Sequence, residues 1–138
     1  MFDELKKYKN KNHFFFTAKE ELETVCNAPK DKSGVYLVYE LKNGRIELVY
    51  IGSSGKIQNN GTIKNRNGGL YDRIVNGKQF GQPRKKSWKK KLIDENIDAF
   101  DIYWYDTETT EIPSFVEATI IQRFFEVQGR LPRWNKEV

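Results

Sequence analysis

The feature that most constrains the fold is a pair of apolar, tyrosine-containing segments joined by Asn43 and Gly44. The segments read GVYLVYEL (34–41) and IELVYIG (46–52), and their Val, Leu, Ile and Tyr residues favour strands. Asn-Gly between two such segments is the strongest short hairpin signal, because both residues tolerate the positive φ of a two-residue turn. The sequence therefore predicts two adjacent antiparallel strands.

The remaining segments predict several helices and one further strand. Residues 99–106 (AFDIYWYD) alternate in polarity with period two, which predicts a third strand. Helices are expected at 17–27, 70–77, 83–96 and 113–129; the first begins with a capping box of Thr17 and Glu20. This order predicts an α+β fold with a small three-stranded antiparallel sheet flanked by helices. A chain of 138 residues predicts a single domain, 1–138, whose residues 1–30 form a helical N-terminal extension.

A long polar segment and a concentration of positive charge follow the hairpin. Residues 53–69 (SSGKIQNNGTIKNRNGG) predict a long insertion loop, and loops of this length are usually functional or disordered. Eleven of the 24 Lys and Arg residues, but one of the 19 acidic residues, lie between 56 and 91. This window carries +10 and the remainder carries −5. The asymmetry indicates either a polyanionic partner or a solvated lysine-rich face.

The composition excludes several kinds of site. Cys26 and His13 are the only cysteine and histidine, so a Cys/His zinc cluster is excluded and a Ser-His-Asp site is not expected. We interpret Cys26 as a core or surface thiol. No apolar run approaches the roughly 20 residues of a membrane span, and the first residues lack the apolar centre of a secretory signal. We therefore expect a cytoplasmic protein that does not contact membranes.

Glu117 is the polar residue that fits its expected surroundings least well. In the predicted helix it shares one face with Ile120, Ile121 and Phe124. A carboxylate in such a position is costly unless it is paired, used as a cap or bound to a metal. Ser114 and Glu117 have the spacing of a capping box, which is one interpretation. The other is a ligand for a hard cation at the rim of the core.

Four further residues allow a structural and a functional interpretation. Arg73 is either a surface arginine, for instance a partner of Asp72, or a phosphate ligand, because guanidinium groups match phosphate oxygens. Tyr36 and Tyr50 are ordinary strand residues when taken singly, and Asn135 can be a turn residue. Their order along the chain raises the weight of the functional interpretation.

This order resembles the GIY-YIG nuclease family. The resemblance rests on GVY (34–36), YIG (50–52), Arg73 in LYDRIVNG, Glu117 in PSFVEATIIQRF and Asn135 in PRWN. It implies a single GIY-YIG nuclease-like domain whose sheet comprises residues 34–41, 46–53 and 99–106. The two tyrosines would point to one face of this sheet, where Arg73 and Glu117 meet them.

The resemblance also implies a chemistry, namely a divalent-metal-dependent DNA endonuclease that leaves 5′-phosphate and 3′-hydroxyl ends. Glu117 would hold one Mg²⁺ or Mn²⁺, and Arg73 would bind the scissile phosphate. Tyr36 would act as general base or position the attacking water, and Tyr50 would orient the nucleophile or the phosphate. Asn135 would brace the site by hydrogen bonding.

Some positions depart from the family pattern. The first motif is GVY rather than GIY, and Gly77 stands where many relatives have a His or Tyr one turn after the helical arginine. That auxiliary role is therefore vacant or filled elsewhere. Some relatives use a lysine soon after YIG, for which Lys56 and Lys64 are the candidates here.

Double-stranded DNA is the expected partner, bound through phosphate contacts of the basic window. The expected contacts are Lys56, Lys64, Arg66, Lys78, Arg84, Lys85, Lys86, Lys89 and Lys90. Trp88 is assigned to the core side of its helix rather than to base stacking. The long insertion resembles that of the restriction enzymes of the family, which implies either a homodimer or two sequential events to cut both strands.

Two other functions stay open. One is a non-catalytic nucleic-acid-binding module that uses the basic surface of residues 56–91. The other is a partner-binding module in which Glu117 is only a helix cap. The sequence leaves open the recognition sequence and the choice between DNA and RNA.

Overall fold

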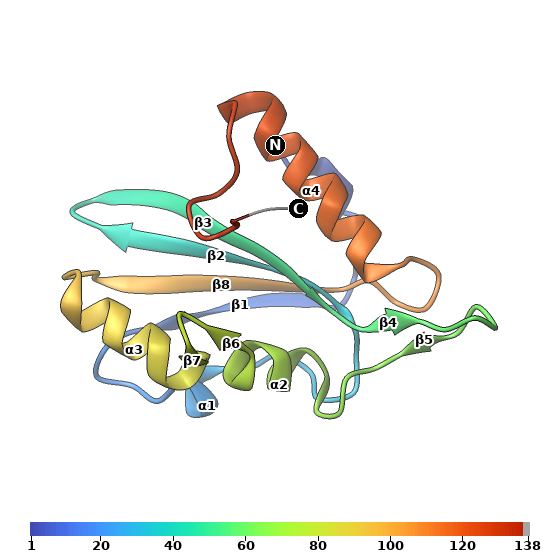
Figure 1. Cartoon of the computed structure of the whole chain (residues 1–138), viewed down its shortest axis with the longest axis horizontal. Coiled ribbons are helices and arrows are strands. Elements are labelled where there is room, and N and C mark those ends of the chain that lie inside the picture. The colour runs from blue at the N-terminus through green and yellow to red at the C-terminus, as the bar shows by residue number, and fades with distance from the viewer. Residues whose placement is uncertain (137–138) are drawn as a thin grey trace.

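The computed structural model describes residues 1–136 and has helices on both faces of a four-stranded antiparallel sheet (Figure 1). The strands are β1 (Lys11–Phe16), β2 (Gly34–Lys42), β3 (Arg45–Ser54) and β8 (Ala99–Asp106). Their order in the sheet is β1-β8-β2-β3. The α+β class is confirmed, whereas the expectation of three strands is wrong because β1 adds a fourth.

The N-terminal region is the part that the sequence predicted incorrectly. Residues 1–30 do not form a helical extension but contain η1 (Asp3–Leu5), β1 and the short α1 (Leu22–Val25). In β1, Phe14 and Phe16 are buried and Phe15 is exposed, which is the period of a half-buried strand. The Glu20 carboxylate accepts bonds from the Thr17 backbone N and Oγ at 2.9 and 3.0 Å. The expected cap contact therefore forms, but the turn does not continue as a helix over 17–27.

The β2–β3 hairpin forms as predicted. Asn43 and Gly44 have φ values of 53° and 76°, as the two central residues of a type I′ turn require. The pairing register shifts between Val38 and Tyr39, so that Tyr50 lies opposite Val38 while Leu48 lies opposite Tyr39. This irregularity lets consecutive residues 49 and 50 both pack against the same core.

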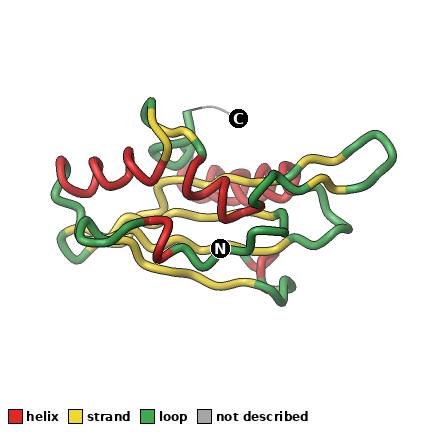
Figure 2. Tube along the Cα trace, turned by 90° about the horizontal axis from the view of Figure 1, so that it is seen from below, coloured by secondary structure: helices red, strands yellow, loops and turns green. Residues whose placement is uncertain are grey.

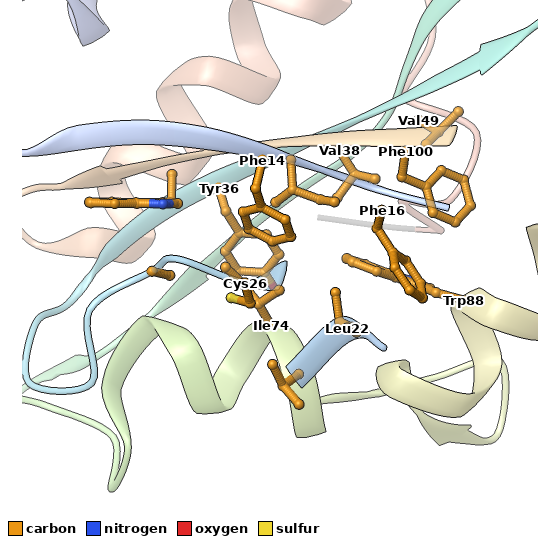
Figure 3. Packing of buried hydrophobic residues seen from close by; sticks show 14 of the residues in the cluster. Phe14, Phe16, Leu22, Cys26, Tyr36, Val38, Val49, Ile74, Trp88 and Phe100 are labelled. Atoms are coloured by element: carbon orange, nitrogen blue, oxygen red, sulfur yellow. The ribbon is translucent and has the colours of Figure 1, made fainter. Parts of the chain in front are cut away.

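Different helices cover the two faces of the sheet (Figure 1). On one face α1, α2 (Gly69–Asn76) and α3 (Arg84–Asp94) enclose a core that includes Tyr36, Trp88 and Phe100 (Figure 3). On the other face α4 (Pro113–Gln128) packs through Ile120 and Phe124. The burial of Trp88 confirms its assignment to the core.

A two-stranded ribbon occupies most of the expected insertion loop. β3 continues to Ser54 and is followed by β4 (Lys56–Ile57), which pairs with β5 (Ile63–Lys64). The ribbon extends away from the sheet in both views (Figures 1 and 2). A second small hairpin, β6 (Lys78–Gln79) and β7 (Gln82–Pro83), separates α2 from α3. Within residues 1–136, none of the helices has the length and apolar character needed to cross a membrane.

Candidate active site at the edge of the sheet

Tyr36 and Tyr50 lie side by side on the face of the sheet that α2 and α3 cover. Tyr36 is opposite Gly52 in the β2–β3 pairing, and the two tyrosine rings have centroids 6.1 Å apart. A Cβ atom on Gly52 would lie 2.6 Å from Cζ and Oη of Tyr36 and 2.7 Å from Cε2 of Tyr50. Gly52 is therefore the position where the strand leaves room for both phenol groups.

The two phenol groups differ in their surroundings. Tyr36 is fully buried, and its hydroxyl has no hydrogen-bond partner among residues 1–136. Burial raises the pKa of Tyr50 to about 12; Tyr36 and Glu117 add to this rise, and Arg84 and Arg73 oppose it. Tyr50 is therefore a neutral hydroxyl near pH 7, able to donate a hydrogen bond.

Arg73 reaches the site from α2 with an unsatisfied side chain. The expected alternative, an ion pair with Asp72, does not form, because Asp72 accepts bonds from Arg66 Nε and Asn76 Nδ2, each at 2.7 Å. The Nε of Arg73 is buried without a partner in the described part of the chain. Arg73 lines a cleft of about 830 Å³, and Ser53 and residues of the β4–β5 ribbon also line this cleft.

Glu117 approaches the same end of β3 from the opposite face. The α4 helix has Ile112 at its N-cap and no side-chain cap bond, so the interpretation of Glu117 as part of a capping box is wrong. Burial raises the pKa of the Glu117 carboxyl, while Ser53 and the charge of Arg73 oppose this rise. No Lys or Arg nitrogen of residues 1–136 forms an ion pair with this half-buried carboxylate.

Because β3 is the edge strand, groups from both faces converge beside it. Ser53, next to Gly52, is the β3 residue that interacts with Glu117. Ser53 and Ser114 line the cleft, whereas Glu117 itself is not part of its lining. The tyrosines lie on one face as expected, whereas Glu117 belongs to α4, which covers the other face, and interacts with Ser53 of β3.

Asn135 is bonded to β3 between the tyrosine and the glycine of the second motif. Its Oδ1 accepts the Ile51 N–H at 3.0 Å, and its Nδ2 donates to the Ile51 carbonyl at 2.9 Å. Trp134 N donates to the Val49 carbonyl at 2.9 Å. The C-terminal segment thus pairs with the edge strand like a short additional strand and fixes the backbone beneath Tyr50.

Arg84 lies in a different place from the one that the sequence suggested. It was expected on the DNA-binding surface, but its side chain is only 1% exposed, so that expectation of a surface position is wrong. Its Nη1 donates to the Arg73 carbonyl at 2.7 Å, and its guanidinium carbon lies 5.3 Å from the ring centres of both Tyr36 and Tyr50. The space beside Gly77 is thus filled by this guanidinium.

The other expected DNA contacts fall into two groups. Arg66, Lys89 and Lys90 pair with Asp72, Glu21 and Asp94, respectively. The remaining lysines form no ion pair within residues 1–136 and are exposed except for the half-buried Lys85; they are Lys56, Lys64, Lys78, Lys85 and Lys86. The cleft beside Arg73 is lined by three further cations, Lys56, Lys64 and Arg66, and by no carboxylate.

Burial settles the character of Cys26. The thiol is buried, and burial raises its pKa to about 12. It therefore stays protonated near neutral pH, as a core thiol does.

The sequence pattern did not indicate two features near this end of the sheet, the position of Ser54 and the burial of Arg84. The Ser54 hydroxyl is buried without a partner in residues 1–136 and lines the same cleft. Arg84 carries a buried charge. Neither has a local signal, because both are defined by contacts with distant segments.

Comparison of the chain with protein-family models, with curated proteins and with solved structures found no match.

Proposed function

We propose that this chain is a divalent-metal-dependent endonuclease that hydrolyses DNA phosphodiester bonds, as its resemblance to the GIY-YIG nucleases implies. The observation that supports this most strongly is the set of unsatisfied polar groups at one end of β3. The Tyr36 hydroxyl and Arg73 Nε are buried without partners in residues 1–136, and the charge of Arg73 acts on the half-buried Glu117. Each unpaired buried group costs about 1–3 kcal/mol, and a ligand that satisfies such groups explains why they are kept.

In the proposed reaction a water oxygen attacks phosphorus, the bond from phosphorus to O3′ breaks, and the leaving O3′ takes a proton from solvent water. Arg73 binds the scissile phosphate and stabilises its growing charge. Tyr36 acts as general base towards the attacking water or positions that water. The neutral Tyr50 hydroxyl donates a hydrogen bond to the water or the phosphate. The products carry 5′-phosphate and 3′-hydroxyl ends.

Glu117 is suited to a hard cation. Its carboxylate is half-buried, and burial raises its pKa. A divalent cation nearby would oppose this effect and favour the ionised form. Residues 1–136 contain no group of three or more His, Cys, Asp or Glu side chains placed to hold a metal. One carboxylate completed by water and phosphate oxygens is a normal arrangement for Mg²⁺. Bound Mg²⁺ or Mn²⁺ would supply Lewis-acid stabilisation of the phosphate.

The ribbon supports a polyanionic substrate. Lys56 and Lys64 are directly opposite each other in the β4–β5 pairing, and like charges in this position destabilise a strand pair. Phosphate groups would relieve this repulsion. The cleft of about 830 Å³ runs along the same lysines to Arg73. We therefore propose double-stranded DNA as the substrate, restriction as one role, and a homodimer as one way to cut both strands.

A second candidate function is nucleic-acid binding without catalysis. It is favoured by the lining of the cleft, which includes four cations but not Glu117. A protein that only binds phosphates needs the cations and has no use for the carboxylate.

Cleavage of supercoiled plasmid DNA in Mg²⁺ or Mn²⁺ tests the proposal. Wild type should nick or cut the plasmid, and EDTA or Glu117→Ala should abolish this. Glu126→Ala is the matched control, because Glu126 is an exposed carboxylate on the same helix, and it should cleave like wild type. DNA binding without cleavage by wild type would favour the second function, and cleavage by Glu117→Ala would show that the site is wrong.

A further inference from the structure

Arg84 is a cation placed inside the protein core. Its side chain is 1% exposed, and it forms no ion pair with any Asp or Glu of residues 1–136. A buried charge without a counterion is expensive, and an apolar side chain of similar volume is usually a cheaper filling. The charge of this residue therefore calls for an explanation beyond packing.

Neutral groups surround the guanidinium. Its Nε donates to Gln79 Oε1 at 3.1 Å, and its Nη1 donates to the Arg73 carbonyl near the C-terminus of α2. The rings of Tyr36 and Tyr50 are both 5.3 Å away and that of Trp88 is 5.5 Å away. Carbonyl dipoles and aromatic faces compensate part of the charge, and they also connect it to both tyrosines.

The chain makes room for this guanidinium at Gly77. A Cβ atom on Gly77 would overlap with Arg84 Nη1 and with the Arg73 carbonyl oxygen. The Arg84 N–H in turn donates to the Gly77 carbonyl at 3.0 Å. Arg84 is also the first residue of α3, where the helix dipole disfavours a cation. The positive charge is thus held here against two electrostatic costs, burial and the helix dipole.

We infer that Arg84 is a positioning residue of the proposed nuclease site, which fixes the Tyr36 and Tyr50 rings and the Arg73 backbone and supplies a fixed positive charge beside the two phenols. This inference rests on the proposed function. Negative charge that develops on a phenol or on the phosphate is stabilised by a cation that water does not screen. Arg84 acts through the tyrosines and need not touch DNA.

The electrostatics of Tyr50 agree with this role. Burial, Tyr36 and Glu117 raise the pKa of Tyr50, whereas Arg84 and then Arg73 lower it. Arg84 is therefore the strongest of the charges that favour ionisation of this phenol.

The test is a double-mutant cycle in plasmid cleavage with excess enzyme. Arg84→Gln should cleave about 100-fold more slowly, as expected when a site loses its geometry, while its affinity for DNA in EDTA stays unchanged. Arg84→Lys, which keeps the charge, should recover part of the rate. In the Tyr36→Phe background, Arg84→Gln should slow cleavage less than about threefold, because the two residues act as one unit. Arg45→Gln, an exposed arginine at the hairpin turn, is the control and should leave the rate unchanged.

Three results would overturn the inference. Arg84→Gln could cleave DNA as fast as wild type, or its loss of DNA affinity could account for its slower cleavage. Arg84→Gln could also slow cleavage in the Tyr36→Phe background as much as it does in wild type. If Arg84→Gln does not fold, the effect of Arg84→Lys on cleavage is measured instead, in wild type and in the Tyr36→Phe background. If wild type does not cleave, the proposed function fails, and NMR of ¹³Cζ-labelled tyrosine judges Arg84 separately. At neutral pH the ¹³Cζ resonances of Tyr36 and Tyr50 should then shift in Arg84→Gln and not in Arg45→Gln, because the guanidinium lies 5.3 Å from both rings; unshifted resonances contradict the inference.

Discussion

The two ends of the β2–β3 hairpin differ in whether their buried polar groups have partners. Near the turn, the buried Glu40 carboxylate accepts a bond from Arg133, which also donates to Glu47 at 3.0 Å. At the open end, the Tyr36 hydroxyl and the Arg73 Nε are buried without partners in residues 1–136. Near the turn the charged groups are paired within the chain, whereas at the open end two buried polar groups have no hydrogen-bond partner among the described residues.

We interpret this difference as one between polar groups that stabilise the fold, at the turn end, and polar groups that serve the proposed function, at the open end. The turn-end ion pairs attach the C-terminal segment to β2 and β3, and the same segment carries Asn135 to Ile51. The open end gains nothing in stability from its unpaired groups, since each carries a desolvation cost. Changes at the turn end should therefore alter stability, and changes at the open end should alter cleavage.

Apart from Arg73→Gln, which is considered last, the largest effect among the variants that sharpen this comparison should come from Tyr36→Phe. We expect cleavage to fall about 100-fold, as for loss of a general base, and the free energy of unfolding to rise by about 1 kcal/mol because an unpaired hydroxyl is removed. Urea unfolding and plasmid cleavage measure the two quantities.

Tyr71→Phe is the control for this variant. The Tyr71 hydroxyl donates to the Glu23 carbonyl at 2.6 Å, so its removal should lower stability by up to about 1 kcal/mol and leave cleavage unchanged. A large loss of stability in Tyr36→Phe would mean that its hydroxyl is satisfied after all.

Arg133→Gln should have the opposite effect at the turn end. It leaves the buried Glu40 carboxylate without its cation, and we expect unfolding to become easier by about 2 kcal/mol. This is less than for a fully buried pair because Arg133 is partly exposed. Urea unfolding checks this, with Arg45→Gln as the control; equal stability of the two variants would contradict a structural role for the pair.

Removing the facing lysines of the ribbon should have a smaller effect. The double variant Lys56→Gln/Lys64→Gln should reduce the salt dependence of DNA affinity by about two phosphate contacts. Titrations of DNA binding at several salt concentrations measure the slope. Lys9→Gln/Lys19→Gln removes the same charge from exposed positions outside the ribbon, and an equal change in slope there would argue against a specific role of the ribbon.

The smallest expected effect concerns the stability of Glu117→Gln. Burial raises the pKa of Glu117 above its ordinary 4.5, so the folded state binds the proton more tightly than the unfolded state, and stability falls as pH rises from 4.5 through the raised pKa. Glu117→Gln should be more stable than wild type at pH 7 by at most about 1 kcal/mol, since the carboxylate is partly solvated. The gain should disappear in acid below pH 4.5.

Thermal unfolding at pH 4 and pH 7 checks this prediction, with Glu126→Gln as the control. Mn²⁺ should stabilise wild type at pH 7 and leave Glu117→Gln unchanged. Equal stabilisation of both proteins by Mn²⁺ would show that the metal binds elsewhere.

The sequence predicted those elements whose pattern is local. The Asn43-Gly44 turn and the alternation in β8 are contained in a few residues, and the structure has β8 at Ala99–Asp106, as predicted. β1 was missed because a run of three phenylalanines becomes a strand only through its pairing with β8. The capping box at Thr17 formed its contact, but tertiary packing decided that the helix did not continue.

The candidate site also has a part that the sequence predicted and a part that it did not. The positions of Tyr36, Tyr50, Arg73 and Glu117 near one end of β3 were expected from the motif order, while their roles remain predictions. The burial of Arg84 was not foreseeable, because a helix that begins Arg-Lys-Lys is typically solvated. Its burial depends on space left at Gly77 and on two rings from another part of the chain.

The most direct test of the account compares plasmid cleavage by Arg73→Gln and Arg133→Gln in Mg²⁺, at a temperature where both variants are folded. Each removes one arginine from one end of the same hairpin. We predict that Arg73→Gln loses about 10³-fold in rate, as for loss of a group that stabilises transition-state charge. Arg133→Gln should lose much less, because Asn135 keeps its own bonds to Ile51. Equal rates for the two variants, or a defect confined to Arg133→Gln, would contradict the account.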